Sequence, residues 1–582
     1  MKGSMRSLRL VSFLFFLAFC FVSGVAAQTT QNSDPDPAKP ATMTQLPAAT
    51  SQTAPSSFDQ VIDRIVEREH FFVAQMRHMH PLVETYIQNM KSDKELGAVP
   101  VGDHYFLGRL DMSNGTDDRA FAGRPGFGRR MLDSLTSVYS LHFLPLGFAQ
   151  MVMMDDDFQK RFYNLTFVRR EFLGETRCLV IDVQPKESAG KGRFLGRIWV
   201  EDQDYNIVRF NGTYSPHAST SFYLHFDSWR LNMRPGVWLP AYVYSEESDL
   251  KYHMSQNLHF KAQTRLWGYD IKNLRTDEFT AIQVDAPQTV KDQSETGQDA
   301  TPVEAERMWQ RQAEDNAVER LQKIGLLAPS GDVDKVLTTV VNNLIVTNNL
   351  DIQPDVRARV LLTAPLESFT IGHTIVVSRG LLDVLPDEAS LAMVLARELA
   401  HIALGHQLDT RYAFNDRMFF ADEDTFSAFT FRRSRADEDE ADKRALELLA
   451  NSPYKDKLGN AGLFLKALQD RAPDLKNLIR ARLGDGMVSG KTLRMSALLN
   501  SAPQLDERKK DQIAALPLGG RIKVDPWTSQ ATLAKAKPVA LLSAREKMPF
   551  EVTPVFPYIT RISTAGSEKV ASVPAAPAPE AK

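Results

Sequence analysis

The chain has 582 residues, and its 69 Lys and Arg residues against 72 Asp and Glu residues give a formal net charge of −3. Apolar residues make up 43% and charged residues 24%, which is typical of a globular protein and excludes a collagen-like or wholly disordered chain. Because positive and negative charges nearly balance, the composition gives no indication of nucleic-acid binding, and we expect no nucleic-acid partner.

The N-terminus is typical of a secretory signal. Basic residues precede an apolar run at 10–22, and the small residues 25–27 fit a cleavage site. The run is shorter than the roughly 20 residues that a membrane-spanning helix needs. We therefore predict a cleaved signal peptide, no transmembrane span in the mature chain, and export to the periplasm or extracytoplasmic envelope. Cleavage would remove Cys20 and leave Cys178 without a partner for a disulfide.

Residues 58–286 are predicted to form a helix followed by an antiparallel sheet. The sequence is helix-like over 58–90, and short segments rich in aromatic and β-branched residues come after it. Turns such as Arg234-Pro235-Gly236 separate these segments, which is the pattern of an antiparallel meander. The clearest predicted strands are 178–183, 194–200, 206–210, 222–231 and 237–244.

This pattern resembles the bacterial lipoprotein-carrier domains, whose curved half-barrel sheet encloses a hydrophobic ligand. The resemblance implies a lipoprotein or acyl ligand for residues 58–286. The alternative is a curved sheet that packs on its own helix. No residue of this segment is a candidate for catalysis.

One helix in the second half of the chain carries charged groups on an otherwise apolar surface. Residues 391–404 are apolar apart from Arg397, Glu398 and His401. At about 100° per residue, these three side chains share one stripe of the helix. Burial of charge without a partner is costly, so the stripe should face a cleft or meet compensating charges.

A second helix, predicted over 436–450, is expected to supply those compensating groups. Its Glu438 and Asp442 lie four residues apart and therefore on one face. We expect the first helix to be capped by Asp387 and to end at Gly405.

Together the two helices resemble the gluzincin zinc metallopeptidases of the HtpX/BepA type, which are related to the CAAX-prenyl proteases. Members of that family have an H-E-x-x-H helix and a later E-x-x-x-D helix. The corresponding segments here are R-E-L-A-H at 397–401 and E-D-E-A-D at 438–442, within a resemblance that covers about 330–455. It implies a mainly helical gluzincin-like fold, a zinc cofactor, and a polypeptide substrate or client.

The resemblance also implies a role for each matching residue. Glu398 takes the position of the general base, and His401 and Glu438 take positions of zinc ligands. Asp442 takes the position of the residue that steadies a ligand, and His406 is a candidate for a similar supporting role.

Arg397 stands where the family has its first zinc-binding histidine. A guanidinium has five N–H donors and no lone pair to give, so Arg397 is not a metal ligand. Two protein ligands would remain where a catalytic zinc site typically has three. A positive charge here could replace the metal, since Arg397 and a protonated His401 would balance Glu398 and Glu438. We expect Arg397 to bridge Glu398 or Glu438 and zinc binding to be weak.

Several alternatives stay open at this stage. His406 or His373, the latter on a predicted strand at the cleft, could restore a third ligand, although neither has the spacing of one. The chain is either an envelope metalloendopeptidase of protein quality control, with catalysis impaired by Arg397, or a non-catalytic pseudo-peptidase that binds polypeptide or lipoprotein clients. Whether it is an enzyme is left undecided.

Two further segments near the site have a simple interpretation. The Phe-rich stretch 407–431 is either an apolar lid or, more simply, packing between the two helices. The basic run 432–435 is interpreted as a solvent-exposed face.

The sequence therefore predicts an α+β protein with an N-terminal antiparallel curved sheet and helix, followed by a mainly helical gluzincin-like domain. The expected parts are a signal peptide (1–27), a disordered linker (28–57), a β half-barrel-like domain (58–286), a second linker (287–301), a metallopeptidase-like domain (302–455), a C-terminal helical and extended extension (456–564) and a disordered tail (565–582).

Overall fold

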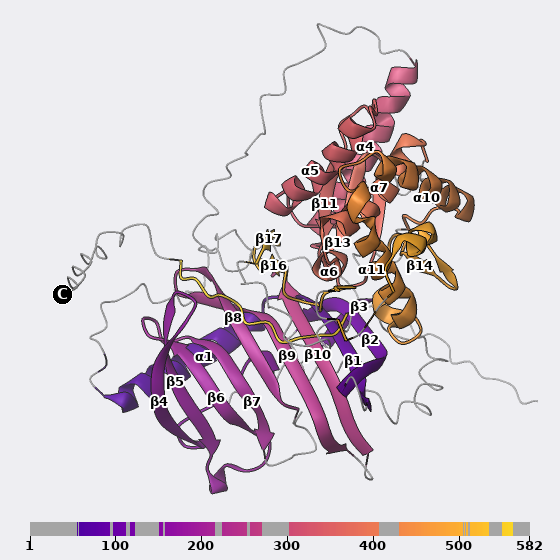
Figure 1. Cartoon of the computed structure of the whole chain (residues 1–582). Helices are drawn as coiled ribbons and strands as arrows, with labels where there is room; N and C mark the ends of the chain where they lie inside the picture. Colours follow the sequence, from indigo (N-terminus) through magenta and orange to yellow (C-terminus); the bar gives the residue numbers. More distant parts are fainter. Residues whose placement is uncertain are drawn as a thin grey trace, which may run out of the picture. The chain divides into compact units, whose positions relative to one another are not determined.

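The computed structural model describes residues 55, 57–93, 97–111, 117–122, 151–154, 158–215, 224–252, 256–269, 302–406, 430–504, 506, 508–509, 512–534 and 550–562. All the elements below belong to the unit Ser56–Lys582, which Figure 1 shows. The predicted signal peptide, the second linker, the tail and nearly all of the first linker and the Phe-rich stretch lie outside the described residues. No helix in the described part of the chain is long and apolar enough to cross a membrane.

The predicted α+β fold class is confirmed. Helix α1 (Phe58–Met76) precedes a ten-stranded sheet, in which every neighbouring pair is antiparallel and the order is β3-β2-β1-β10-β9-β8-β7-β6-β5-β4. The strands are β1 (Leu82–Asp93), β2 (Gly97–Asp111), β3 (Asp117–Ala122), β4 (Tyr163–Leu173), β5 (Thr176–Pro185), β6 (Arg193–Glu201), β7 (Ile207–Ser215), β8 (Phe226–Arg234), β9 (Val237–Tyr252) and β10 (Gln256–Trp267).

The helix predicted over 58–90 is wrong in its second half, because α1 ends at Met76 and β1 begins at Leu82. Both faces of β1 are buried: Leu82 joins one hydrophobic cluster and Val83 the other. Buried polar residues such as Gln88 also lie on this strand, so its sequence lacks the alternation of polar and apolar residues that would distinguish it from a helix. Pro81, which has no N–H to donate, separates the two elements.

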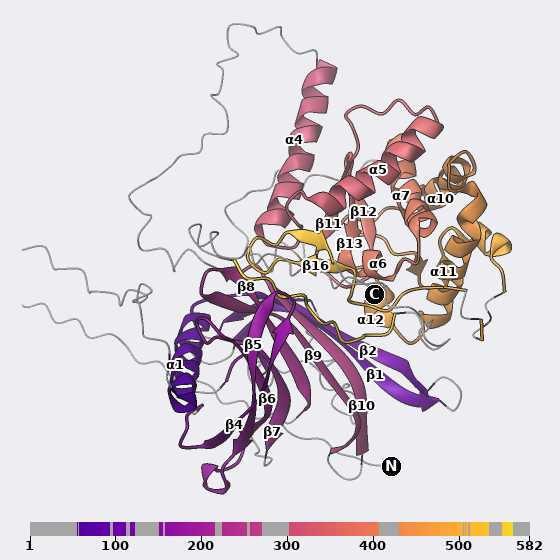
Figure 2. The same ribbon diagram turned by 60° about the vertical axis from the view of Figure 1, so that its left-hand side comes forward.

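One face of the sheet packs on α1, which lies beside it in Figures 1 and 2. Ile65 and Phe72 of the helix share a buried cluster with Ile181, Ile198 and Phe210 of the sheet. This cluster encloses an ion pair in which the Arg230 guanidinium donates to both oxygens of Glu69, at 2.7 and 2.8 Å. Side chains of α1 therefore cover part of this sheet face.

The second half of the chain is mainly helical around a three-stranded sheet of order β11-β13-β12. Its principal elements are α4 (Pro302–Lys323), α5 (Asp332–Thr347), β11 (Arg357–Leu361), β12 (Ser368–Ile371), β13 (Thr374–Ser378), α6 (Arg379–Val384), α7 (Glu388–Ala403), α10 (Arg435–Ala450), α11 (Leu458–Arg471) and α12 (Lys476–Ile479). Short elements follow: β14 (Val488–Ser489), β15 (Thr492–Leu493), the 3-10 helix η6 (Ser496–Ser501), β16 (Ile522–Val524) and β17 (Ala531–Leu533).

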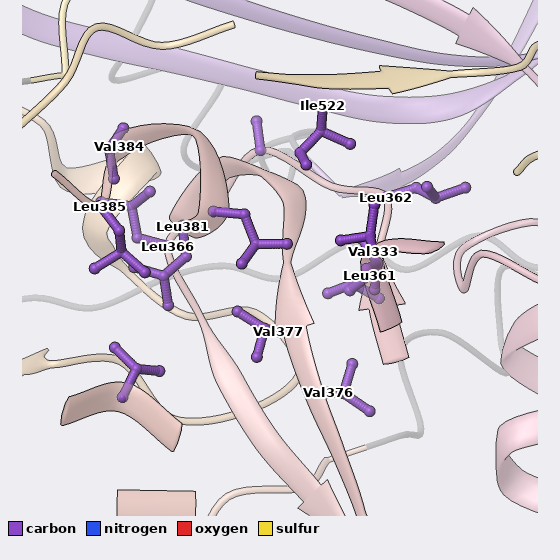
Figure 3. Packing of buried hydrophobic residues seen from close by; sticks show 14 of the residues in the cluster. Val333, Leu361, Leu362, Leu366, Val376, Val377, Leu381, Val384, Leu385 and Ile522 are labelled. Carbon is purple, nitrogen blue, oxygen red and sulfur yellow. The ribbon is translucent and has the colours of Figure 1, made fainter. Parts of the chain in front are cut away.

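The small sheet is buried, and this fixes the elements that surround the site. Val376 and Val377 are adjacent in β13 and both fully buried, so each face of the strand contacts core. Figure 3 shows these side chains among Leu361, Leu381 and Ile522, which come from β11, α6 and β16. Helix α7 packs against α5, α10, α11 and the strands of this sheet.

Candidate functional site

The local sequence sets the ends of α7 as predicted. The Asp387 side chain accepts a hydrogen bond from the backbone N–H of Ser390 at 2.9 Å, which caps the first turn. Gly405 follows the last turn with φ of 70°, a left-handed conformation that favours glycine. The predictions for Asp387 and Gly405 are confirmed. Arg397, Glu398 and His401 are all buried in the second half of this helix.

Helix α10 brings Glu438 and Asp442 to α7. The Ser434 hydroxyl caps the helix by accepting from the backbone N–H of Asp437 at 3.2 Å. Ala441 and Ala445 are fully buried small residues on this helix, so the backbones of the two helices can approach closely. Glu438 is 3% exposed as a result.

The Arg397 guanidinium contacts three carboxylates at once. Its Nη1 lies 3.1 Å from Glu398 Oε1, its Nη2 contacts Glu438 Oε2, and its Nε lies 3.3 Å from Asp442 Oδ1. Arg397 has no exposed surface. The structure thus brings together four residues singled out in the sequence, and Arg397 meets both of the glutamates that it was expected to bridge.

A second guanidinium, from Arg494, completes the cluster. Its Nε lies 3.3 Å from Glu438 Oε2, and its Nη1 lies 2.6 Å from Asp439 Oδ1 and 3.8 Å from Asp442 Oδ2. The next residue, Met495, has φ of 54°, and its backbone N–H donates to Asp442 at 3.2 Å. Arg494 was not predicted from the sequence, because no spacing links this residue, which lies beyond α12, to the two helices.

His401 is neutral at this site. Burial, followed by the nearby charges of Arg397 and Arg433, lowers its pKa to about 2. The expectation of a protonated His401 is therefore wrong, since a cation would be both desolvated and surrounded by guanidinium groups. Arg494 supplies the second positive charge instead.

Glu398 is held from two sides. Its Oε1 accepts a hydrogen bond from the Ser368 hydroxyl of β12 at 2.7 Å and contacts Arg397. Burial raises the pKa of Glu398, while the adjacent Arg397 charge opposes that shift. The position that the resemblance assigns to the general base is thus occupied by a carboxyl that contacts both the Ser368 hydroxyl and the Arg397 guanidinium.

The two other candidate histidines lie in different places. His406 Nδ1 is 2.9 Å from His401 Nδ1, so one of these nitrogens donates and the other accepts. His373 lies in the turn between β12 and β13, and not on a strand as predicted. The charges that act on it, from Arg311 and Arg357, are outside the Arg397 cluster.

The residues at this site do not fit a zinc ion. His401 Nε2 and Glu438 Oε1 lie 3.4 Å apart, and neither forms a hydrogen bond with a described residue. The group beside them is the Arg397 guanidinium, which has no lone pair to give to a metal. Across the described residues, no three or more His, Cys, Asp or Glu side chains are grouped as a metal site would require.

The segment before α10 is mostly exposed, as predicted, with one exception. Arg432, Ser434 and Arg435 are exposed, whereas Arg433 is half-buried. Arg433 donates to the backbone oxygen of His406 and to the Thr370 hydroxyl, the latter at 2.6 Å. Of the Phe-rich stretch, Phe431 is described, and its ring stacks on Phe369 with centroids 4.7 Å apart.

This region matches a known protein family. Residues 334–421 match the family model of peptidase family M48. The predicted resemblance to M48-type zinc metallopeptidases is thereby confirmed, and these residues belong to a metallopeptidase-like domain. The match contains Arg397, Glu398 and His401 and ends before α10. Within M48, a polypeptide is the substrate class that such a domain implies.

Solved structures were also compared with the chain. A DUF1329 family protein from Desulfovibrio piger is 11% identical, with a TM-score of 0.21, over 38% of this chain and 97% of its own. A LolA superfamily protein from Nitrosomonas europaea is 9% identical, with a TM-score of 0.18, over 36% of this chain and 92% of its own. No curated protein matches the chain.

Proposed function

We propose that this protein is a metal-free pseudo-peptidase, which uses an M48-like fold to bind polypeptide clients without cleaving them. The observation that carries the proposal is the buried contact of the Arg397 guanidinium with Glu398, Glu438 and Asp442. A zinc ion bound to His401 and Glu438 would lie beside this cation. The two positive charges would repel each other strongly, because little water is present to screen them.

The electrostatics of the cluster support the same proposal. Arg397 and Arg494 provide two permanent positive charges, and both approach Glu438. Burial raises the pKa of Glu398 and of Asp442, which favours their neutral forms and reduces the negative charge that the guanidinium groups must balance. Two guanidinium groups therefore supply the positive charge that a dication supplies in a zinc enzyme.

The second candidate function is an active zinc metalloendopeptidase of envelope protein quality control. The M48 match over 334–421 favours it, as does the order of Glu398, His401, Glu438 and Asp442 along the chain. In that case Glu398 would serve as general base, and zinc would supply the activated water. The guanidinium at position 397 is the observation against this candidate.

Location and the role of the N-terminal sheet are further parts of the proposal. The predicted signal peptide at 1–27 supports export to the periplasm or extracytoplasmic envelope.

For residues 58–286 we propose a lipoprotein or acyl ligand. Because α1 packs on this sheet face, a ligand bound beneath the helix would have to displace it. A fluorescent fatty acyl probe that binds the full chain saturably would support this role, and absence of binding would leave the sheet as a scaffold.

The pseudo-peptidase proposal is tested by the metal content and casein cleavage of the purified full chain. We expect far less than one zinc per chain and no cleavage. The Arg397→His variant restores a possible third ligand and is expected to gain both, unless it fails to fold, which circular dichroism would reveal. Near-stoichiometric zinc in the unmodified chain, abolished by Glu438→Ala, would overturn the proposal whatever the variant does.

A further inference from the structure

A cavity of about 990 Å³ adjoins the Arg397 cluster and is strongly basic. Glu438 and Arg494 belong both to the cluster and to the cavity wall. The cationic lining comes from three separate segments: Arg432, Arg433 and Arg435 before and at the start of α10, Lys476 and Arg480 at α12, and Lys491 and Arg494 near the β14–β15 hairpin.

The two acidic residues of the lining are already engaged. Glu438 contacts Arg397 and Arg494, and Asp485 accepts the backbone N–H of Arg433 at 3.1 Å. Lys476, Arg480 and Lys491 are exposed, and among the described residues none of them forms a salt bridge with a carboxylate. The cavity therefore presents uncompensated positive charge to whatever enters it.

The cavity wall is held in place by hydrogen bonds and is partly apolar. Glu367 accepts three backbone N–H groups, from Arg482, Leu483 and Gly484, at 2.7, 2.8 and 3.1 Å, which fixes the loop after α12. Ile479 and Leu493 are buried apolar residues of the lining. This combination of apolar surface with a few charged groups is typical of ligand sites, and the volume lies at the upper end of their usual range.

We propose that this cavity binds acidic polypeptide segments in which carboxylate and apolar side chains are mixed. The inference rests on the proposed function, because it names the class of client that the pseudo-peptidase takes. A phosphate site would require donors that converge on one point, whereas here the cations are spread over three segments and apolar residues separate them. Carboxylates along an extended peptide match that distribution.

The test is fluorescence polarisation with the full chain in EDTA and a labelled short peptide that alternates Glu and Leu. The triple variant Lys476→Glu, Arg480→Glu and Lys491→Glu is expected to weaken binding by about tenfold or more, because it reverses the charge of the cavity. The matched control, Lys443→Glu, Lys455→Glu and Lys457→Glu, makes the same change of charge at exposed residues outside the lining and is expected to bind within about twofold of the parent.

Two comparison probes decide the outcome. A peptide with Gln in place of Glu is expected to bind at least about tenfold more weakly, and equal binding would overturn the inference. If vesicles of phosphatidylglycerol displace the acidic peptide from the chain, the inference is overturned. It is also overturned if the cavity variant and the control variant lose binding equally. The result is independent of the metal test. A metal-free chain that binds neutral but not acidic peptides would contradict this inference alone. A zinc-loaded chain that prefers acidic peptides would contradict the pseudo-peptidase proposal alone.

Discussion

Arg397 on α7 and Glu438 on α10 form a buried ion pair. The side chains of both residues are at most 4% exposed. The pair links the two helices that carry the motif residues, so the cluster holds the site together as well as giving it charge. Five predictions follow from this arrangement and from the groups around it.

Loss of Arg397 should be strongly destabilising. The Arg397→Met variant removes a buried cation and leaves Glu438 and Asp442 with Arg494 as their remaining guanidinium partner. We expect the free energy of unfolding to fall by about 3–5 kcal/mol, which urea denaturation would measure. The exposed Arg435→Met serves as a matched control and should change it by less than about 0.5 kcal/mol.

A double variant separates the charge effect from packing. Arg397→Met combined with Glu438→Gln removes both charges of the pair, so neither partner stays buried as a charge without the other. The combined loss of stability should be clearly smaller than the sum of the two single losses. Strict additivity would contradict the direct interaction between the two residues.

Arg494 should behave as a member of the same cluster. Replacement by Met removes its contacts with Glu438, Asp439 and Asp442. A loss of about 2–4 kcal/mol is expected in thermal or urea unfolding, and Arg494→Lys should recover little of it, because a single ammonium does not reproduce the guanidinium fork. An Arg494→Met variant as stable as the parent would show that Arg397 alone balances the carboxylates.

The stability of the chain should depend on pH through Glu367. Burial raises the pKa of this carboxyl, although three backbone N–H groups and Arg482 oppose the shift. A carboxyl whose pKa is raised in the folded state holds its proton more tightly there than in the unfolded chain. Its effect therefore makes the protein less stable as the pH rises above the unfolded pKa of about 4.5.

The matched variant for this prediction is Glu367→Gln, which keeps an acceptor oxygen for the loop and does not titrate. The difference in unfolding free energy, parent minus variant, should fall between pH 5 and pH 8. Urea denaturation at several pH values gives this difference. A difference that rises over the same range would mean that the pKa of Glu367 is lowered in the folded protein.

A test of the helix cap completes the set. Asp387→Ala removes the acceptor for the Ser390 N–H at the start of α7, and the expected cost is about 1 kcal/mol in unfolding free energy. Asp387→Asn keeps an acceptor and should lose less than half of that. If both variants matched the parent, the cap would have no role in the stability of the site helix.

The two site helices could be predicted from the sequence because the residues that determine them lie close together along the chain. Asp387, Gly405 and the spacing of the charged residues on α7 all act within one or two turns. Strand β1 was predicted as helix because its two buried faces erase the alternation of polar and apolar residues. Arg494 and the neutral state of His401 depend on residues that are distant along the chain, and no local pattern encodes them.

The most direct test of the central claim is anomalous X-ray scattering at the zinc edge from crystals of the full chain soaked in zinc. The account predicts that the Arg397 guanidinium lies against Glu438 and Asp442, with no anomalous peak within bonding distance of His401 Nε2. A strong peak bonded to both His401 and Glu438, with Arg397 displaced, would contradict it.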